Sequence, residues 1–414
     1  MMRLQKIYKI CLKDLDKDYA LLMLSMFFRR VAQGFLEVTR TIYLALIGFD
    51  PISIGIITSV GFGVSVVEST LFGVLSDKYG RKIFLALGNL MAAIRFLLYA
   101  LSKDFWVLTV AQGLGALGEG AGAGQPVVSG YISDRERDGV KRAHIFSLIA
   151  VTNALASSIG SLLAALPAYL REALGFSDVE AHIRLFWTGF LLSAFSLALT
   201  ALLRDVSGGK KVGENRKSAS SVKEPSALRE IAVYSFIRST DGLAMGFVSS
   251  LAPLYFYLRF SASSEDLAPV YALARFLPIP LYLVAPLLIS RLGYVKPLIA
   301  VRAASGLCSL LLAVAENFSA ASLMFILYMV LVEIGMPLRQ AFATEIADES
   351  TVGSLVGVSN SIRTLVRSIS PTAVGHFFQV SQFYTPFVIG ASLFFFNAAQ
   401  FHIFYSKRFR RKFV

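Results

Sequence analysis

The segment from residue 18 to residue 48 carries a row of polar and charged side chains within an otherwise apolar stretch. Arg29, Arg30, Gln33, Glu37 and Arg40 fall within an arc of about 100° when 3.6 residues form one helical turn. Such side chains are costly against lipid and normally face a cavity or a charged partner. Because guanidinium groups bind carboxylates and phosphates through paired hydrogen bonds, the row favours contact with an anion.

A second interpretation of this row needs no ligand. Glu37 has Arg30 and Arg40 within reach on its own helix face, so these three charges can neutralise one another. Arg29 can extend its guanidinium toward the lipid headgroups. We favour a functional role for the row, and the sequence leaves the structural interpretation open.

Ionisable residues recur deep in the later apolar segments. The cations are Arg95, Arg238, Arg275, Arg339, Arg363 and Arg367, and the anions are Glu68, Glu119, Asp241 and Glu333. With the first segment included, these segments contain nine arginines and five acids. This excess of positive charge weakly favours an anionic substrate, such as a carboxylate or a phosphorylated metabolite. A lipophilic cation remains an alternative substrate because of Glu119 and the many aromatic residues. Arg238 and Asp241, three residues apart, can also form a purely structural ion pair.

Glu119 is the residue whose carboxyl group we expect to take up and release a proton. It lies about 14 residues into its apolar segment, close to the bilayer midplane, at 1.5 Å per helical residue. No charged residue stands one turn away on its own helix. A buried carboxyl group without a nearby cation holds a proton readily, whereas a neighbouring arginine favours its ionised form. Glu37, Asp241 and Glu333 are further candidates.

The elements that position these residues are apolar segments of membrane length. Hydrophobic residues make up 55% of the 414 residues and the mean hydropathy is +0.63, values that a soluble protein would not show. Twelve spans are predicted at 18–48, 52–76, 82–102, 105–132, 142–169, 183–203, 230–258, 266–290, 294–315, 319–345, 352–380 and 384–405. A polar linker at 204–228, rich in Gly, Ser and Lys, separates bundles of six spans at 18–203 and 229–405.

Lysine and arginine gather on one side of the predicted spans. They lie at 1–17, 78–82, 135–142, 204–223 and in the basic tail 406–414, whereas the opposite loops hold chiefly Lys103, Arg171 and Arg184. Cytoplasmic loops carry this excess, so both termini are predicted to be cytoplasmic in a multi-pass protein of the cell membrane. The same placement argues against nucleic acid as the partner behind the net charge of +13. Residues 1–17 are predicted to form an amphipathic helix on the inner surface, with a frayed basic tail as the alternative.

The turn between the second and third spans reads Gly73-Val-Leu-Ser-Asp-Lys-Tyr-Gly80-Arg81-Lys82. Gly80 permits a tight reversal, and Gly73 permits close approach of another helix. Asp77 falls at a helix C-terminus, where an anion is disfavoured and needs a cationic or helix-N-terminal partner. This stretch resembles the G-x-L-x-D-x-x-G-R-K/R loop of the major facilitator superfamily and fills its pattern without a gap.

The two bundles resemble each other weakly, as the halves of that family do. Phe27 to Gly34 is similar to Phe236 to Gly242, and Leu75 to Gly80 is similar to Leu288 to Gly293. The resemblance implies an all-α integral membrane fold, with twelve transmembrane helices in two six-helix bundles related by a pseudo-two-fold axis. It also implies that helices 1, 4, 7 and 10 line a central cavity. The substrate site would then contain Arg30, Gln33, Glu37, Arg40, Gln112, Glu119, Arg238, Asp241, Glu333 and Gln340.

Two further features bear on the mechanism. The turn residues Gly73, Asp77, Gly80 and Arg81 would form a latch that closes the cytoplasmic side in one state. This sequence differs from the family pattern at two places. Leu114 lies where many proton-coupled members have an arginine, and the helix 5 pattern of drug/proton antiporters is absent. Assignment as a drug/proton antiporter is therefore weakened.

The sequence thus predicts a secondary active transporter that moves a small organic solute by alternating access. Proton coupling is left open, and the substrate leans toward an anionic metabolite. The alternatives are an exporter of lipophilic cations or drugs and a membrane receptor without flux. We expect no enzyme activity, cofactor or metal site, because no catalytic set or Cys/His cluster with ligand spacing occurs. The expected partners are a small-molecule substrate and the lipid bilayer, and we expect a monomer.

Overall fold

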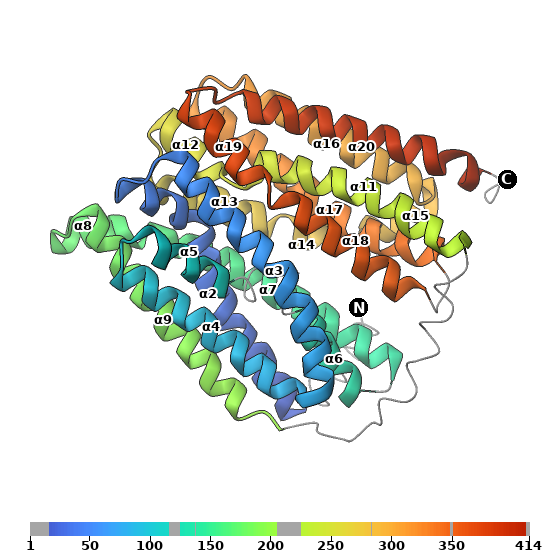
Figure 1. Cartoon of the computed structure of the whole chain (residues 1–414), viewed down its shortest axis with the longest axis horizontal. Helices are drawn as coiled ribbons and strands as arrows, with labels where there is room; N and C mark the ends of the chain where they lie inside the picture. The colour runs from blue at the N-terminus through green and yellow to red at the C-terminus, as the bar shows by residue number, and fades with distance from the viewer. Residues whose placement is uncertain are drawn as a thin grey trace, which may run out of the picture.

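The computed structural model describes residues 16–115, 125–136, 138–204, 225–282, 284–347 and 351–410, and these are helical apart from short connections (Figure 1). The first half of the chain contains α2 (Lys17–Leu46), α3 (Pro51–Tyr79), α4 (Arg81–Leu101), α5 (Phe105–Leu114), α6 (Gln125–Arg135), α7 (Gly139–Leu162), η2 (Leu163–Ala165), α8 (Leu166–Leu174) and α9 (Asp178–Ala201). The second half contains α11 (Pro225–Ser249), α12 (Ala252–Phe260), α13 (Ser264–Phe276), α14 (Pro278–Leu281), α15 (Val284–Leu292), α16 (Val295–Ala313), α17 (Phe318–Ile346), α18 (Val352–Arg367), α19 (Ser370–Gln379) and α20 (Thr385–Arg410). The predicted N-terminal amphipathic helix, Glu119 and most of the predicted linker fall outside the described residues.

Local capping chemistry sets several helix boundaries. Asp50 accepts a hydrogen bond from the amide of Ser53 at 2.8 Å, and Pro51 provides the first residue of α3. Ser177 and Glu180 form a capping box at the start of α9. Gly80 separates α3 from α4 with φ at +99°, a backbone conformation that residues with a Cβ atom rarely adopt. The tight reversal predicted at this glycine is confirmed.

The described residues are consistent with the twelve predicted spans. Eight helical stretches are long and apolar enough to cross a membrane, and a ninth results if α13–α14 and the helix after it form one bent span. The remaining predicted spans are α2, which carries the charged row, α5 with α6, and α18 with α19. The charged row distinguishes α2 from a simple apolar helix, α5 and α6 are separated by residues outside the described part of the chain, and α18 and α19 are two shorter helices. The helix α11 begins at Pro225, inside the predicted linker, so the polar composition there extends into a helix.

The two halves touch mainly near one end of the helices. We call this the distal end; it contains the connections at 47–50, 102–104, 175–177, 261–263, 314–317 and 380–384, and the opposite end, where α2 begins and α20 ends, is the terminal end. In Figure 1 the ribbons of the halves converge toward α5, α8 and α12 and diverge toward α6 and α18. The principal contacts between halves join α3 with α19 and α7 with α13.

Small side chains allow α3 and α19 to come into close contact near the distal end. A Cβ atom at Gly55 would lie 2.5 Å from the carbonyl oxygen of Pro371, and one at Gly375 would lie 2.2 Å from that of Pro51. Backbone therefore meets backbone where α3 crosses α19. Ser59 and Thr372 share a hydrogen bond of 2.8 Å beside this crossing.

An ion pair also links the halves at the distal end. Arg171 of α8 contacts Asp178 at 2.6 Å within its own half and Glu265 of the second half at 2.5 Å. The α7–α13 contact adds a hydrogen bond of 3.0 Å from the Ser158 hydroxyl to the carbonyl oxygen of Ala272. These contacts hold the two halves together on the distal side of the charged residues described next.

Candidate functional site

Three charged side chains from three helices meet between the halves, and we call them the central triad. Arg275 of α13 donates to Glu37 of α2, so this contact crosses from the second half to the first. The Nη1 atom of Arg275 also lies 3.6 Å from Oε1 of Glu333 on α17. The side chains remain 23%, 29% and 19% exposed for Arg275, Glu37 and Glu333, although each lies well inside its helix. Part of the surface of each side chain therefore remains accessible at this depth, where the halves meet.

The central triad lies at membrane depth along its three helices. Glu37 lies nine residues before the end of α2, Arg275 eleven residues after the start of α13, and Glu333 fifteen residues after the start of α17. At 1.5 Å per residue, these spacings place the triad about 14–22 Å from the distal end, within the depth of a bilayer core. The pairing meets the requirement that charges at such depth have partners.

A proline-containing segment from α13 to α14 places Arg275 and Tyr282 around Glu333. Pro278 lacks an amide hydrogen, as does Pro280, and the helix α13 ends at Phe276 just before them. Tyr282, which follows the short helix α14, donates from its hydroxyl to Oε2 of Glu333 at 3.0 Å. Arg275 and Tyr282 thus reach the two oxygens of one carboxylate.

Arg30 is the cation of this region without a described counter-ion. It has electrostatic interactions with Glu37, Arg275 and Glu333, yet no hydrogen bond or ion pair involves its guanidinium in the part of the chain that the structure describes. Glu37 and Glu333 are instead held by Arg275 and Tyr282. Arg30 therefore offers free N–H donors beside a triad whose own charges are already shared.

Two other polar residues of α2, Gln33 and Arg29, lie against the first half. Gln33 accepts a hydrogen bond of 2.6 Å from Arg95 of α4, and Arg29 donates to Asn89 of α4 at 3.3 Å. Arg40 is buried, with 6% of its surface exposed. The predicted row on α2 therefore divides, because Arg30 and Glu37 approach the second half whereas Gln33 and Arg29 contact α4.

A second charged cluster lies within the second half. Asp241 of α11 lies 2.9 Å from Arg238, 2.6 Å from Arg302 and 3.1 Å from Arg363. The pair of Arg238 and Asp241 that the spacing permits is thus present, with two further arginines around it. Asn360 accepts a hydrogen bond of 2.7 Å from Arg238.

The remaining predicted site residues lie apart from the central triad. Gln112 is fully buried in the first half and accepts a hydrogen bond of 3.2 Å from Tyr99. Gln340 is exposed near the terminal end of α17. Glu119 lies outside the described residues. The structure thus brings Arg30, Glu37 and Glu333 together and places Arg238 and Asp241 in the neighbouring cluster.

The turn residues lie at the terminal end of the first half. Arg81 pairs with Asp77, lies 3.3 Å from Asp134 of α6 and donates to the Ser76 hydroxyl at 2.7 Å. Asp77 therefore has the cationic partner that its position at a helix C-terminus demands. A Cβ atom at Gly73 would lie 3.6 Å from Pro126, so α6 does approach α3 there.

Sequence reasoning gives too little weight to three residues of these clusters. Arg275 has no partner within its own helix, because Glu37 and Glu333 come from two distant helices. Arg302 lies in a span that otherwise looks apolar, and an arginine in such a span is the signal that marks it. Tyr282 has no charge pattern, and its position after two prolines is the available clue.

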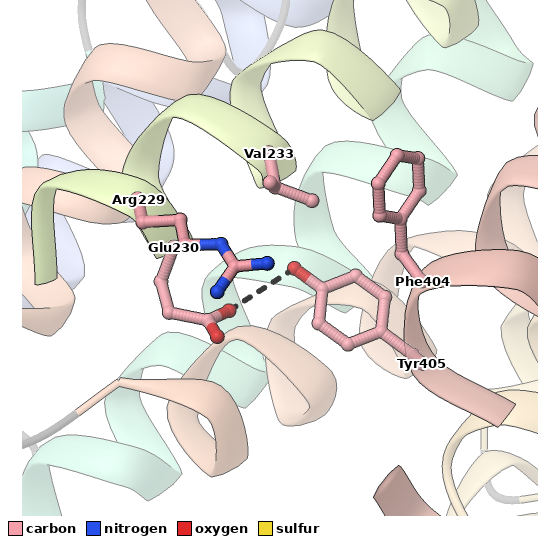
Figure 2. Close-up of a pocket in the computed structure, with 5 residues that line it drawn as sticks. All are labelled: Arg229, Glu230, Val233, Phe404 and Tyr405. Atoms are coloured by element: carbon pink, nitrogen blue, oxygen red, sulfur yellow. Dashed lines mark hydrogen bonds between the residues drawn. The ribbon is translucent and has the colours of Figure 1, made fainter. Parts of the chain in front are cut away.

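A pocket near the terminal end lies away from the central triad. Arg229, Glu230 and Val233 of α11 line it together with Phe404 and Tyr405 of α20 (Figure 2). The Tyr405 hydroxyl donates to Glu230 at 3.3 Å across this pocket. Both helices belong to the second half, so the pocket is not part of the space between the halves.

Comparison with known proteins supports the same fold over nearly the whole chain. An uncharacterized membrane protein of Saccharomyces cerevisiae, YJR124C, is 21% identical over 92% of each chain. The quinolone resistance protein NorA of Staphylococcus aureus is 24% identical over 39% of this chain and 43% of its own length. The crystal structure of the nucleoside transporter NupG superposes with a TM-score of 0.73 at 15% identity, over 94% of this chain and 99% of NupG.

The family follows from a match to a family model. The model of the Major Facilitator Superfamily matches residues 22–371, which is most of the chain. The matched range contains the turn from Gly73 to Lys82, the central triad and the Asp241 cluster. The chain therefore belongs to the major facilitator superfamily, and it is a multi-pass membrane protein of a transporter family.

Proposed function

We propose that the protein is a secondary active transporter for a small organic anion, which binds beside the central triad and crosses by alternating access. The observation that carries the proposal is the contact of Glu37 from the first half with Arg275 from the second, beside the free guanidinium of Arg30. An anionic group that reaches Arg30 and Arg275 would be held by charge-assisted hydrogen bonds from both halves. Binding would thus be coupled to the relative position of the halves.

The arrangement of the halves supports alternating access. The described contacts between them concentrate at the distal end, in the α3–α19 crossing and the Arg171–Glu265 pair. The triad lies on the terminal side of these contacts and is partly exposed. In this state the substrate would exchange with the terminal side, which the loop charges predict to be cytoplasmic. Rocking of the two halves would then open the distal side.

We keep Glu119 as the proposed proton carrier, with Glu37 and Glu333 as residues through which protonation would loosen the contact between halves. Loss of the charge on Glu37 removes its attraction to Arg275, the cross-half contact of the triad. The latch role of Gly73, Asp77, Gly80 and Arg81 also stays a proposal. Arg81 would contribute to it from its present contacts with Asp77 and Asp134.

A ligand screen tests the proposed substrate class. Purified protein is heated with organic anions, sugars or lipophilic cations at two pH values, since a ligand that binds the folded state raises the melting temperature. We expect stabilisation by anions. In Arg30→Gln, loss of one charge-assisted hydrogen bond, worth about 1.5–3 kcal/mol, should weaken anion affinity by about 10- to 100-fold.

Arg29→Gln is the matched control for this screen. Arg29 is adjacent in sequence but donates to Asn89 in the first half, so this variant should respond to anions like the wild type. An equal loss in both variants would contradict a specific role for Arg30. Anion-driven flux in liposomes, absent in Arg30→Gln, would then connect binding to transport.

Export of lipophilic cations is the second candidate function. The similarity to NorA over 168 residues favours it, since that relative is named as a quinolone resistance protein. In this case lipophilic cations would stabilise the protein and anions would not. The effect would be lost in Glu119→Gln and retained in Arg30→Gln, which reverses the pattern expected for an anion carrier.

A further inference from the structure

The Asp241 cluster has more positive charge than its described partners neutralise. Three guanidinium groups, of Arg238, Arg302 and Arg363, surround the single carboxylate of Asp241. Their ion pairs within the described residues include no second carboxylate, so two positive charges remain. The side chains of Arg302 and Asp241 are 0% and 2% exposed, and that of Arg238 is 9% exposed. Uncompensated charge at such burial is costly, particularly within a membrane.

The packing of the helices prevents these charges from moving apart. A Cβ atom at Gly242 would lie 2.3 Å from the carbonyl oxygen of Arg363, so α11 and α18 are in backbone contact next to Asp241. The guanidinium of Arg302 lies over the ring of Phe394, 5.6 Å from its centroid. The excess charge is therefore fixed in place by the surrounding helices.

Hydrogen-bond donors in this cluster also lack acceptors. The Nε and Nη1 atoms of Arg302 are buried and have no hydrogen-bond partner in the described part of the chain. The hydroxyl of Tyr328 is buried too; it lies beside the Ser249 hydroxyl, and within the described residues no acceptor meets it at hydrogen-bond geometry. Tyr328 has an electrostatic interaction with Arg302, and its ring packs on the same Phe394 at 5.8 Å between centroids. Buried donors of this kind normally have a partner.

We propose that a small monovalent inorganic anion, chloride being the probe of choice, binds between Arg302 and Tyr328 and supplies the missing negative charge and acceptor. The side chains of Arg302 and Asp241 are almost completely buried, so we restrict the proposal to an anion of one or a few atoms. Arg363, whose side chain is 17% exposed, provides the partly open side of the cluster. This site is separate from the central triad and does not depend on which solute the protein carries.

A chloride titration of the full-length protein in detergent tests the proposal. Sodium chloride replaces sodium gluconate at constant ionic strength, without any organic substrate, and the melting temperature is recorded. A site that binds chloride in the folded state produces a saturable rise in the melting temperature. Arg302→Gln should abolish this rise. Tyr328→Phe, which removes one hydroxyl and keeps the ring, should weaken the apparent chloride affinity by about tenfold or more, the effect of one hydrogen bond to a charged group.

Arg30→Gln is the control that separates this site from the central triad, because Arg30 is itself a free cation. The chloride response should persist unchanged in this variant. The proposal would be overturned by a melting temperature that is insensitive to chloride. It would equally be overturned by wild-type chloride affinity in Tyr328→Phe, which remains informative should Arg302→Gln fail to fold. Loss of the response in Arg30→Gln alone would assign the anion to the central triad instead.

Discussion

At the scale of single residues, the ion pair of Asp16 and Arg135 ties the beginning of α2 to the end of α6. Arg135 donates to one oxygen of Asp16 from Nη2 at 2.5 Å and from Nε at 3.2 Å. These hydrogen bonds hold the pKa of Asp16 below its ordinary value of 3.8, and the weaker effect of burial acts in the opposite direction. Asp16 precedes the membrane-spanning part of α2 and is exposed.

This pair predicts a pH-dependent contribution to stability. A carboxyl group with a lowered pKa stabilises the fold at pH values above its unfolded pKa, and this contribution disappears as the pH falls through the folded pKa. Asp16→Asn should therefore melt slightly earlier than the wild type at pH 7. The difference should shrink as the pH falls below about 4. Melting curves from pH 7 to pH 3 measure it.

A matched control is Glu172→Gln, which removes an exposed carboxylate that has no described ion pair. Its effect on the melting temperature should be near zero throughout. A difference for Asp16→Asn that is the same at pH 7 and pH 3 would contradict the role of ionised Asp16.

Charged pairs within one helix could be predicted from the sequence, whereas pairs between helices could not. Arg238 and Asp241 stand one turn apart, so their contact follows from helical spacing. Glu37 also has arginines one turn away, yet its described ion pair is with Arg275, more than two hundred residues later. That contact depends on how two helices from different halves approach each other. Arg302 reaches Asp241 for a similar reason.

At the scale of elements, the crossing of α3 with α19 must open if the distal side is to admit a solute. Cysteines at Ser59 and Thr372, whose hydroxyl oxygens lie 2.8 Å apart, should cross-link and hold it closed. We expect oxidised Ser59→Cys/Thr372→Cys protein to bind its ligand from the terminal side and to lose flux. Reduction should restore the flux, which liposome assays would measure.

Each single cysteine variant is the control for this cross-link and should transport equally before and after oxidation. Full flux through a protein whose cross-link is verified by mass would show that this crossing does not move. The native Cys11 and Cys308 are replaced by serine in these variants, so that only the introduced cysteines can be oxidised.

The boundaries of the elements were largely predictable, because they rest on local signals. The predicted first span, 18–48, is close to α2, and the predicted ninth, 294–315, is close to α16. Spans with internal breaks were less predictable. The end of α13 at Phe276 follows from Pro278 and Pro280, yet the contact of Tyr282 with Glu333 depends on the position of α17.

At the scale of the whole molecule, the distribution of basic residues predicts the orientation in the membrane. Basic residues concentrate at the terminal end, which should therefore face the cytoplasm. Intact cells that express single-cysteine variants are treated with a membrane-impermeant maleimide. Glu316→Cys, in an exposed connection at the distal end, should be labelled. Lys78→Cys, exposed at the terminal end, should be labelled only after permeabilisation.

The two variants control each other in this experiment, since both sites are exposed in the structure. Labelling of Lys78→Cys in intact cells, with Glu316→Cys protected, would reverse the orientation. The substrate would then exchange with the outside in the state described here.

The backbone contact at Gly55 and Gly375 has a consequence for energy conservation in the cell. Where two helices touch through their backbones, no row of water molecules can thread between them, and proton hopping along such a row is blocked. An idle copy of the protein would therefore not leak protons along this crossing. Larger side chains at these two glycines would separate the helices, and a molecule that still folds would then lose this barrier to protons.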